Sequence, residues 1–97
     1  MIGSFGDHLA EDLFNDKVSK ETRTFPNELR RAARRKLPYL HDAAELKDLR
    51  VPQGNRLEAL KGEFAGFHSI RIKDQRRLVF MWKSSTPEKV QILEYHR

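Results

Sequence analysis

The chain has 97 residues, of which 38% are hydrophobic and 9% aromatic. A chain of this length buries roughly 60–68% of its unfolded surface, which is enough for one core, so we expect a single domain over residues 1–97. The absence of cysteine excludes disulfide bonds and thiolate metal sites. No apolar run is long enough to cross a bilayer, and the N-terminus lacks the regions of a signal peptide. We therefore expect a cytoplasmic protein that does not contact membranes.

The net charge of +5 arises in the second half of the chain. Residues 1–49 carry nine basic and nine acidic side chains, whereas residues 50–97 carry ten basic and five acidic ones. A basic surplus concentrated in one part of a domain is typical of a surface that binds a polyanion. This distribution favours nucleic acid as a partner, and the alternative is a solvated basic face that binds nothing.

The first quarter of the chain predicts one short helix. Residues 2–5 have the composition of a short strand, and Asp7 is a suitable N-cap for the helix that follows. The apolar positions of that helix are Leu9, Leu13 and Phe14. Residues 16–24 are polar and are expected to form a loop.

The clearest predicted element is an arginine-rich helix that begins at Pro26, because proline is favoured at the first helical position. Its apolar stripe recurs at helical spacing, at Leu29, Ala33, Leu37 and Leu40. Pro38 lacks an N–H and clashes with the preceding turn, so we expect it to kink the helix or end it early. A further short helical turn is expected over residues 43–49, followed by a loop at residues 51–55.

From residue 56 onward the apolar period changes to two, which predicts β-strands. The expected strands span residues 56–60, 67–73, 76–82 and 89–95. The expected turns lie at residues 61–63, at residues 74–75, and at residues 84–88, which include Pro87.

This order of elements predicts an α+β domain, with a short N-terminal strand and two to three helices packed on one face of a small antiparallel sheet. The alternation places Arg71 and Arg77 on the opposite face of that sheet. The positions expected to face the helices are Ile70, Ile72, Leu78, Phe80 and Trp82.

The last four residues, Glu94-Tyr95-His96-Arg97, place a carboxylate, a phenol, an imidazole and a guanidinium side by side at the end of a predicted strand. Acid, base and cationic donors held on a rigid sheet suit phosphodiester chemistry without a metal. No glycine-rich phosphate-binding loop occurs, and no His/Cys/carboxylate spacing indicates a metal site. We therefore expect neither a metal nor a cofactor.

Several features coincide in order and spacing along nearly the whole chain. They are the opening Met1-Ile2-x-Ser4-Phe5, the arginine-rich helix, Ala44-Glu45-Leu46-x-Asp48-Leu49, Gly54-Asn55-Arg56-Leu57-Glu58-x-Leu60-x-Gly62, Ala65-Gly66-x-His68-Ser69-Ile70-Arg71-Ile72, Gln75-x-Arg77-Leu78-x-Phe80-x-Trp82 and the terminal Tyr95-His96. Together they resemble the HigB toxins, a branch of the RelE/ParE superfamily of bacterial toxin–antitoxin systems.

The resemblance implies a type II toxin that enters the ribosomal A site and cuts the messenger RNA being translated, without metal or cofactor. It also implies a helix-turn-helix, HigA-like antitoxin that holds the toxin inactive. Operator DNA would be bound only through that antitoxin. Two alternatives stay open, a ParE-like toxin directed at gyrase and a non-catalytic nucleic-acid-binding module.

Carried over by position, the resemblance implies that Arg77 contacts the scissile phosphate and that Tyr95 and His96 form the end of the active site. Glu94 stands where many relatives have aspartate. Glu58 stands where some relatives have a histidine that assists catalysis. A carboxylate cannot stabilise negative charge as imidazolium does, so Glu58 is either a base or inert.

Metal-free RNA cleavage uses the ribose 2′-hydroxyl as nucleophile and needs a base, a group that neutralises the phosphorane, and an acid for the leaving 5′-oxygen. We assign the phosphorane to Arg77, helped by Arg71 and Lys61, because guanidinium offers planar bidentate donors to phosphate. His96 is the expected proton shuttle because its unperturbed pKa of about 6.5 suits both roles. Tyr95 would orient the substrate, stack on a base or support proton transfer, and Glu94 or Glu58 is a possible base.

The expected RNA-binding residues beyond these are Lys73, Arg30 and Arg34. The last two belong to the basic cluster of the predicted helix, Arg30, Arg31, Arg34, Arg35 and Lys36. This cluster could bind ribosomal RNA, face an acidic antitoxin segment or simply be solvated, and we favour contact with RNA.

Overall fold

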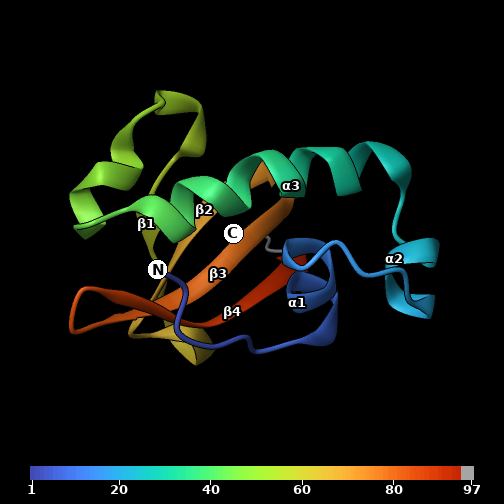
Figure 1. Cartoon of the computed structure of the whole chain (residues 1–97). Helices are drawn as coiled ribbons and strands as arrows, with labels where there is room; N and C mark the ends of the chain where they lie inside the picture. The colour runs from blue at the N-terminus through green and yellow to red at the C-terminus, as the bar shows by residue number, and fades with distance from the viewer. Residues whose placement is uncertain (95–97) are drawn as a thin grey trace.

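The structure, a computed structural model, describes residues 1–94 and is built around a four-stranded antiparallel sheet (Figure 1). The strands follow one another in the sheet as they do in the sequence, so the sheet is a simple meander. They are β1 (Glu58–Ala59), β2 (Phe67–Lys73), β3 (Arg76–Lys83) and β4 (Thr86–Glu94).

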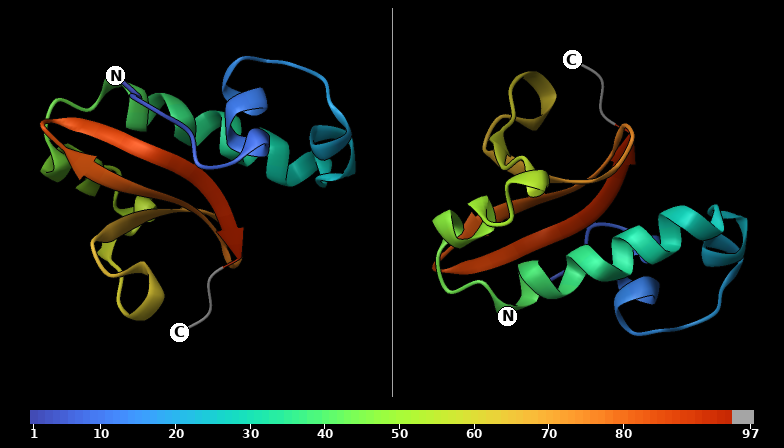
Figure 2. Two further views of the ribbon diagram at one scale, coloured as in Figure 1. Left: turned by 90° about the horizontal axis from the view of Figure 1, so that it is seen from below. Right: turned by 90° about the horizontal axis from the view of Figure 1, so that it is seen from above.

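The helices are α1 (His8–Phe14), α2 (Lys20–Thr24) and α3 (Asn27–Asp42). α3 packs on β2 and β3, and α1 packs on β4 and α3, so both cover the same face of the sheet (Figure 2). α2 packs against α1. The predicted α+β architecture, with helices on one face of an antiparallel sheet, is confirmed.

The connection between α3 and β2 contains three short 3-10 turns as well as β1. The turns are η1 (Leu46–Arg50), η2 (Gln53–Asn55) and η3 (Gly62–Phe64). Figure 2 shows that η3 lies on the side of the sheet away from α3. The helix-free face of the sheet is therefore bordered by this connection, and the candidate site lies there.

The hydrophobic core fills the space between the helices and the sheet. Phe80 of β3 lies at 0% exposure and belongs to the same core cluster as Leu37 and Leu40 of α3. Burial of each such side chain contributes about 1.5–3 kcal/mol. The predicted alternation of β3 is confirmed, since Leu78 and Phe80 belong to the core and Trp82 packs against it.

Pro38 does not end α3, contrary to one of the two outcomes predicted for it. The helix begins at Asn27, with Pro26 at the N-cap, and continues to Asp42. Leu37 and Leu40 flank the proline and are buried in the core. Packing on both sides of Pro38 holds the backbone helical, although proline removes one helical hydrogen bond.

The predicted loop at residues 16–24 was wrong, because α2 occupies its second half. Ser19 and Thr22 form a capping box, in which each side chain accepts a hydrogen bond from the other residue's backbone N–H. Such a box satisfies the free donors at the start of a helix. Only Thr22 of this helix is buried, which explains why no apolar periodicity marked it.

The strand bounds differ from the prediction most at β1 and at the start of β4, and β3 ends one residue later than predicted, at Lys83. β1 has two residues rather than the five expected over 56–60. β4 begins at Thr86, so Pro87 lies inside the strand, opposite Trp82, rather than in a turn. The turn itself is reduced to Ser84 and Ser85, both in the left-handed conformation.

The N-terminal segment forms an isolated parallel bridge between Phe5 and Val90 rather than the predicted short strand. Gly6 N–H donates to the Val90 carbonyl, and Val90 N–H donates to the Ser4 carbonyl. Asp7 caps α1 as predicted, by accepting from Ala10 N–H at 2.8 Å. These bonds cover part of the outer edge of β4, which would otherwise be open to pairing with other chains.

The close approach of this segment to β4 predicts that Gly6→Ala destabilises the fold. A Cβ at Gly6 would lie 2.9 Å from the backbone carbonyl oxygen of Lys89. We expect a loss of about 1–3 kcal/mol in the free energy of unfolding, as for other overpacked sites. Gly54→Ala is the matched control, because a Cβ there meets nothing within 4 Å. Equal urea midpoints for the two variants would contradict the packing described.

Candidate active site

Arg77 is the centre of the candidate site. It lies on β3, points away from the α3 side of the sheet and is only 8% exposed. Its Nε donates to Ser69 Oγ at 2.6 Å, and its Nη2 donates to the Arg56 carbonyl oxygen at 2.6 Å. A guanidinium tied to both a strand and a loop has a fixed direction, which preorganises it for an anionic ligand.

The backbone at Arg56 explains how its carbonyl reaches Arg77. Arg56 follows η2 and has a φ of 47°, in the left-handed region that non-glycine residues rarely adopt. A single residue in this conformation costs on the order of 1–2 kcal/mol. Two hydrogen bonds offset that cost: Arg77 donates to the Arg56 carbonyl, and the Arg56 N–H donates to the Gln53 carbonyl in η2.

Strand register brings Glu58 to the same guanidinium. Glu58 of β1 pairs with Ser69 of β2, the residue that binds Arg77. Glu58 Oε1 lies 3.9 Å from Arg77 Nη2, and the Glu58 side chain is 24% exposed. The predicted pair of Arg77 and Glu58 is therefore brought together, with the carboxylate partly open to a ligand.

Arg71 lies directly opposite Arg77 in the β2–β3 pairing. Residues in this relation share a face of the sheet, so both side chains leave the sheet on the face away from α3, as predicted. Like charges directly opposite each other destabilise a sheet. An anion bound between Arg71 and Arg77 would remove that repulsion, and this favours a phosphate ligand.

Glu94 and Lys61 are placed differently from Glu58. Glu94 Oε1 lies 2.7 Å from Nη1 of Arg76, its partner in the β3–β4 pairing. Alternation along β4 puts Glu94 on the same side as Ile92, which belongs to the core under α3. Lys61 is exposed at the N-cap of η3. The predicted residues Tyr95 and His96 lie outside the described residues.

The other predicted RNA-binding residues form contacts near the molecular surface. Lys73 Nζ lies 3.3 Å from Glu28 Oε2, and Arg34 Nη2 lies 3.2 Å from Asp16 Oδ1. Arg30 Nη2 donates to a side-chain oxygen of Asn27 at 3.4 Å. Pairs exposed in this way contribute about 0.2–1 kcal/mol, so a phosphate could displace them at little cost.

Sequence reasoning missed the residues that hold Arg77 in place. Ser69 is fully buried, and its hydroxyl accepts from Arg77. The Arg56 carbonyl has no sequence signature, because it depends on a left-handed backbone. The sequence offered one signal for Ser69, because alternation puts it on the same face as Arg71 and Arg77. A polar residue that is buried there requires a hydrogen-bond partner, and Arg77 is near enough in the sheet to be that partner.

Within residues 1–94, no cluster of three His, Asp or Glu side chains has the geometry to hold a metal ion. A search of the same residues finds no helix long and apolar enough to span a membrane. The chemical groups that the described site does offer are a fixed guanidinium, a carboxylate beside it and a second guanidinium across the strand pair. This combination can bind a phosphate and accept a proton near it.

Comparison with known proteins identifies the family. A family model described as the RelE-like toxin HigB of type II toxin–antitoxin systems matches residues 3–96. The chain belongs to the HigB-like toxin family. Toxin HigB-1 of Vibrio cholerae serotype O1 (strain ATCC 39315 / El Tor Inaba N16961) is 41% identical to it over 82 residues, which are 84% of each chain.

Solved structures show the same fold as this HigB-like chain. A YoeB–YefM complex from Staphylococcus aureus has a chain that aligns with a TM-score of 0.60 and 17% identity, covering 100% of this chain and 99% of that one. A heterotetrameric YoeB–YefM toxin–antitoxin complex from the same organism aligns with a TM-score of 0.53 and 19% identity, at the same coverage. At these identities the likeness concerns the fold alone.

Proposed function

We propose that this HigB-like toxin is a ribosome-dependent endoribonuclease that cleaves messenger RNA during translation and so inhibits growth. The observation that carries the proposal is Arg77, buried and fixed by Ser69 and Arg56, with Glu58 beside it and Arg71 across the strand pair. Family membership supports an RNA target, and the basic surplus of the chain agrees with it.

In the proposed reaction, a base takes the proton of the ribose 2′-hydroxyl, and the 2′-oxygen attacks the adjacent phosphorus. The bond from phosphorus to the 5′-oxygen breaks, and that oxygen leaves with a proton from an acid. The products are a 2′,3′-cyclic phosphate and a 5′-hydroxyl. Arg77 and Arg71 stabilise the negative charge that builds up on the phosphorane oxygens.

Glu58 is the proposed base, because its carboxylate is fixed beside the arginine that binds the phosphate. We assign Glu94 a positioning role, since its bond to Arg76 ties the end of β4 to β3. His96 is the proposed acid, and Tyr95 orients the substrate. Lys61, exposed at the start of η3, contributes a charge toward the RNA backbone.

The base assignment predicts that Glu58→Gln lowers the rate of messenger cleavage by about 10²–10⁴-fold, because an amide cannot accept the proton. The amide has nearly the shape of the carboxylate, so the unfolding temperature should change little. Cleavage is measured as single-turnover product formation in a purified translation reaction. Glu63→Gln, an exposed change in η3, is the control. A Glu58→Gln variant that cuts as fast as this control would remove Glu58 from the mechanism.

The proposed partner is a helix-turn-helix antitoxin of the HigA kind. Type II systems neutralise the toxin with a protein, and the two structural neighbours are complexes of a toxin with its antitoxin. Operator DNA would be bound through this antitoxin. A toxin that acts on translating ribosomes works in the cytoplasm, where we place it.

A further inference from the structure

A second cationic group involves Lys36 on α3, which is bound to the loop that also carries Arg56. Lys36 Nζ donates to Asn55 Oδ1 at 2.6 Å. Asn55 is fully buried, and its Nδ2 donates to the carbonyl oxygens of Leu49 at 3.2 Å and Val51 at 3.4 Å. The acceptor is thus fixed by the loop around η2, and it holds the Lys36 ammonium in one place.

This ammonium lies among other cations without a neutralising acid. Within residues 1–94, neither Lys36 nor Arg71 forms an ion pair. Burial lowers the pKa of Lys36, and the nearby charges of Arg35 and Arg71 lower it further. The fold therefore gathers positive charge here at a cost, and a bound anion would offset that cost.

The cationic group is joined to the active site by two connections. Asn55, which binds Lys36, is followed by Arg56, whose carbonyl binds Arg77. The charge of Arg71 lowers the pKa of Lys36, and Arg71 lies opposite Arg77 in the sheet. Lys36 is thus linked to Arg77 through Asn55 and Arg56, with Arg71 opposite Arg77 in the sheet, and such a series of cations suits a nucleic-acid backbone.

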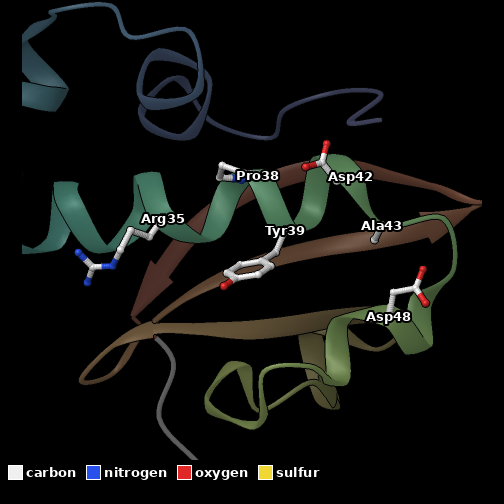
Figure 3. A pocket seen from close by; sticks show the side chains of 6 residues that line it. All are labelled: Arg35, Pro38, Tyr39, Asp42, Ala43 and Asp48. Atoms are coloured by element: carbon white, nitrogen blue, oxygen red, sulfur yellow. The ribbon is translucent and has the colours of Figure 1, made fainter.

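An exposed aromatic ring adjoins this series. Tyr39 lies three residues after Lys36 on α3, and Lys36 Nζ is 5.6 Å from the centre of its ring. The residue is 44% exposed. It lines a pocket of about 290 Å³ between α3 and η1, together with Arg35, Pro38, Asp42, Ala43 and Asp48, and Figure 3 shows the ring projecting from the helix into this space. A pocket of this volume suits one planar group, such as a nucleobase, rather than a larger ligand.

We propose that Lys36, Arg71 and Tyr39 form an accessory RNA subsite, in which the two cations bind a backbone phosphate and the Tyr39 ring stacks on a neighbouring base. The inference rests on the proposed function, because the subsite would bind a further part of the same RNA whose scissile phosphate lies at Arg77. Single-stranded RNA is recognised by this combination of backbone cations and aromatic stacking. Lys36 and Arg71 form no ion pair within residues 1–94, and their positive charge favours RNA over a neutral or basic peptide.

Binding of a short single-stranded 2′-O-methyl RNA tests the proposal, because this RNA lacks the nucleophile and is not cut. Affinity is measured at several salt concentrations. Lys36→Gln removes the charge but keeps an amide donor for Asn55. It should weaken binding and reduce the slope of log affinity against log salt by about 0.7, the value for one phosphate contact on a single strand. Lys20→Gln, an exposed change in α2, should leave the slope as it is.

The stacking part of the proposal is tested with Tyr39→Leu and Tyr39→Phe. Loss of the ring in Tyr39→Leu should weaken binding about fivefold or more, with the salt slope unchanged, whereas Tyr39→Phe keeps the ring and the affinity. Binding by Lys36→Gln and Tyr39→Leu equal to that of Lys20→Gln would overturn the subsite. So would variants that bind RNA normally but bind the antitoxin weakly, since the surface would then belong to the antitoxin.

Cleavage of translated message by the unaltered toxin is measured separately. If the toxin cuts message while these variants bind RNA normally, the subsite alone is wrong. If the toxin cuts nothing while the variants lose RNA affinity as expected, the subsite stands and the proposed reaction is wrong.

Discussion

Arg77→Lys is expected to reduce messenger cleavage by about 10²–10³-fold, the usual effect of removing one preorganised donor to a developing oxyanion. Lysine keeps the positive charge. Its donors all sit on one nitrogen, however, whereas the planar guanidinium binds Ser69 and the Arg56 carbonyl through two different nitrogens and still faces a phosphate. Rates are measured by single-turnover cleavage in a purified translation reaction.

The same change should also lower stability, because Arg77 is buried and bound to two fixed acceptors. We expect a loss of about 1–3 kcal/mol in the free energy of unfolding. In a domain of this size, each kcal/mol corresponds to a fall of about 4–8 °C in the unfolding temperature. The rate assay must therefore be run well below that temperature.

Arg23→Lys, an exposed change in α2, is the matched control for Arg77→Lys. It should leave both the rate and the unfolding temperature within error. If Arg77→Lys were as active as Arg23→Lys, Arg77 would not be the phosphate-binding arginine. Normal stability together with lost activity would instead mean that the bonds to Ser69 and Arg56 contribute little to folding.

His96→Ala is expected to reduce cleavage by about 10²–10⁴-fold, the contribution of a positioned general acid. Retained RNA affinity and an unchanged unfolding temperature would separate a catalytic role from a structural one. Affinity is measured with the uncleavable 2′-O-methyl RNA, and stability by thermal unfolding.

His8→Ala is the control for His96→Ala, because His8 is an exposed histidine in α1. If both variants cut at the rate of the unaltered toxin, His96 has no part in the reaction. A loss of RNA affinity equal to the loss of rate would make it a binding residue.

The sheet was the most predictable part of the fold. The predicted bounds of β2, residues 67–73, match the structure, because alternating side chains mark a strand buried on one face. α2 and the passage of α3 through Pro38 were not predictable in the same way. The first depends on a local capping box, and the second on core contacts made by Leu37 and Leu40.

The site was predictable as a set of residue types but not as a geometry. The resemblance to HigB toxins pointed to Arg77, and alternation placed Arg71 on its face. The burial of Arg77 depends on the left-handed backbone of Arg56, which the sequence does not mark. The sequence did not distinguish Lys36 from the arginines of α3. The hydrogen bond of Lys36 to Asn55 depends on how that helix packs against η2.

The most direct test of the proposed function is a map of messenger 5′ ends by primer extension, after translation in vitro with and without the purified toxin. We expect new ends within translated message only, absent from untranslated message and from a reaction with His96→Ala. Intact message and undisturbed translation would contradict it. Because one fold can host several functions, such a result would turn attention to DNA gyrase, the target expected of a ParE-like toxin.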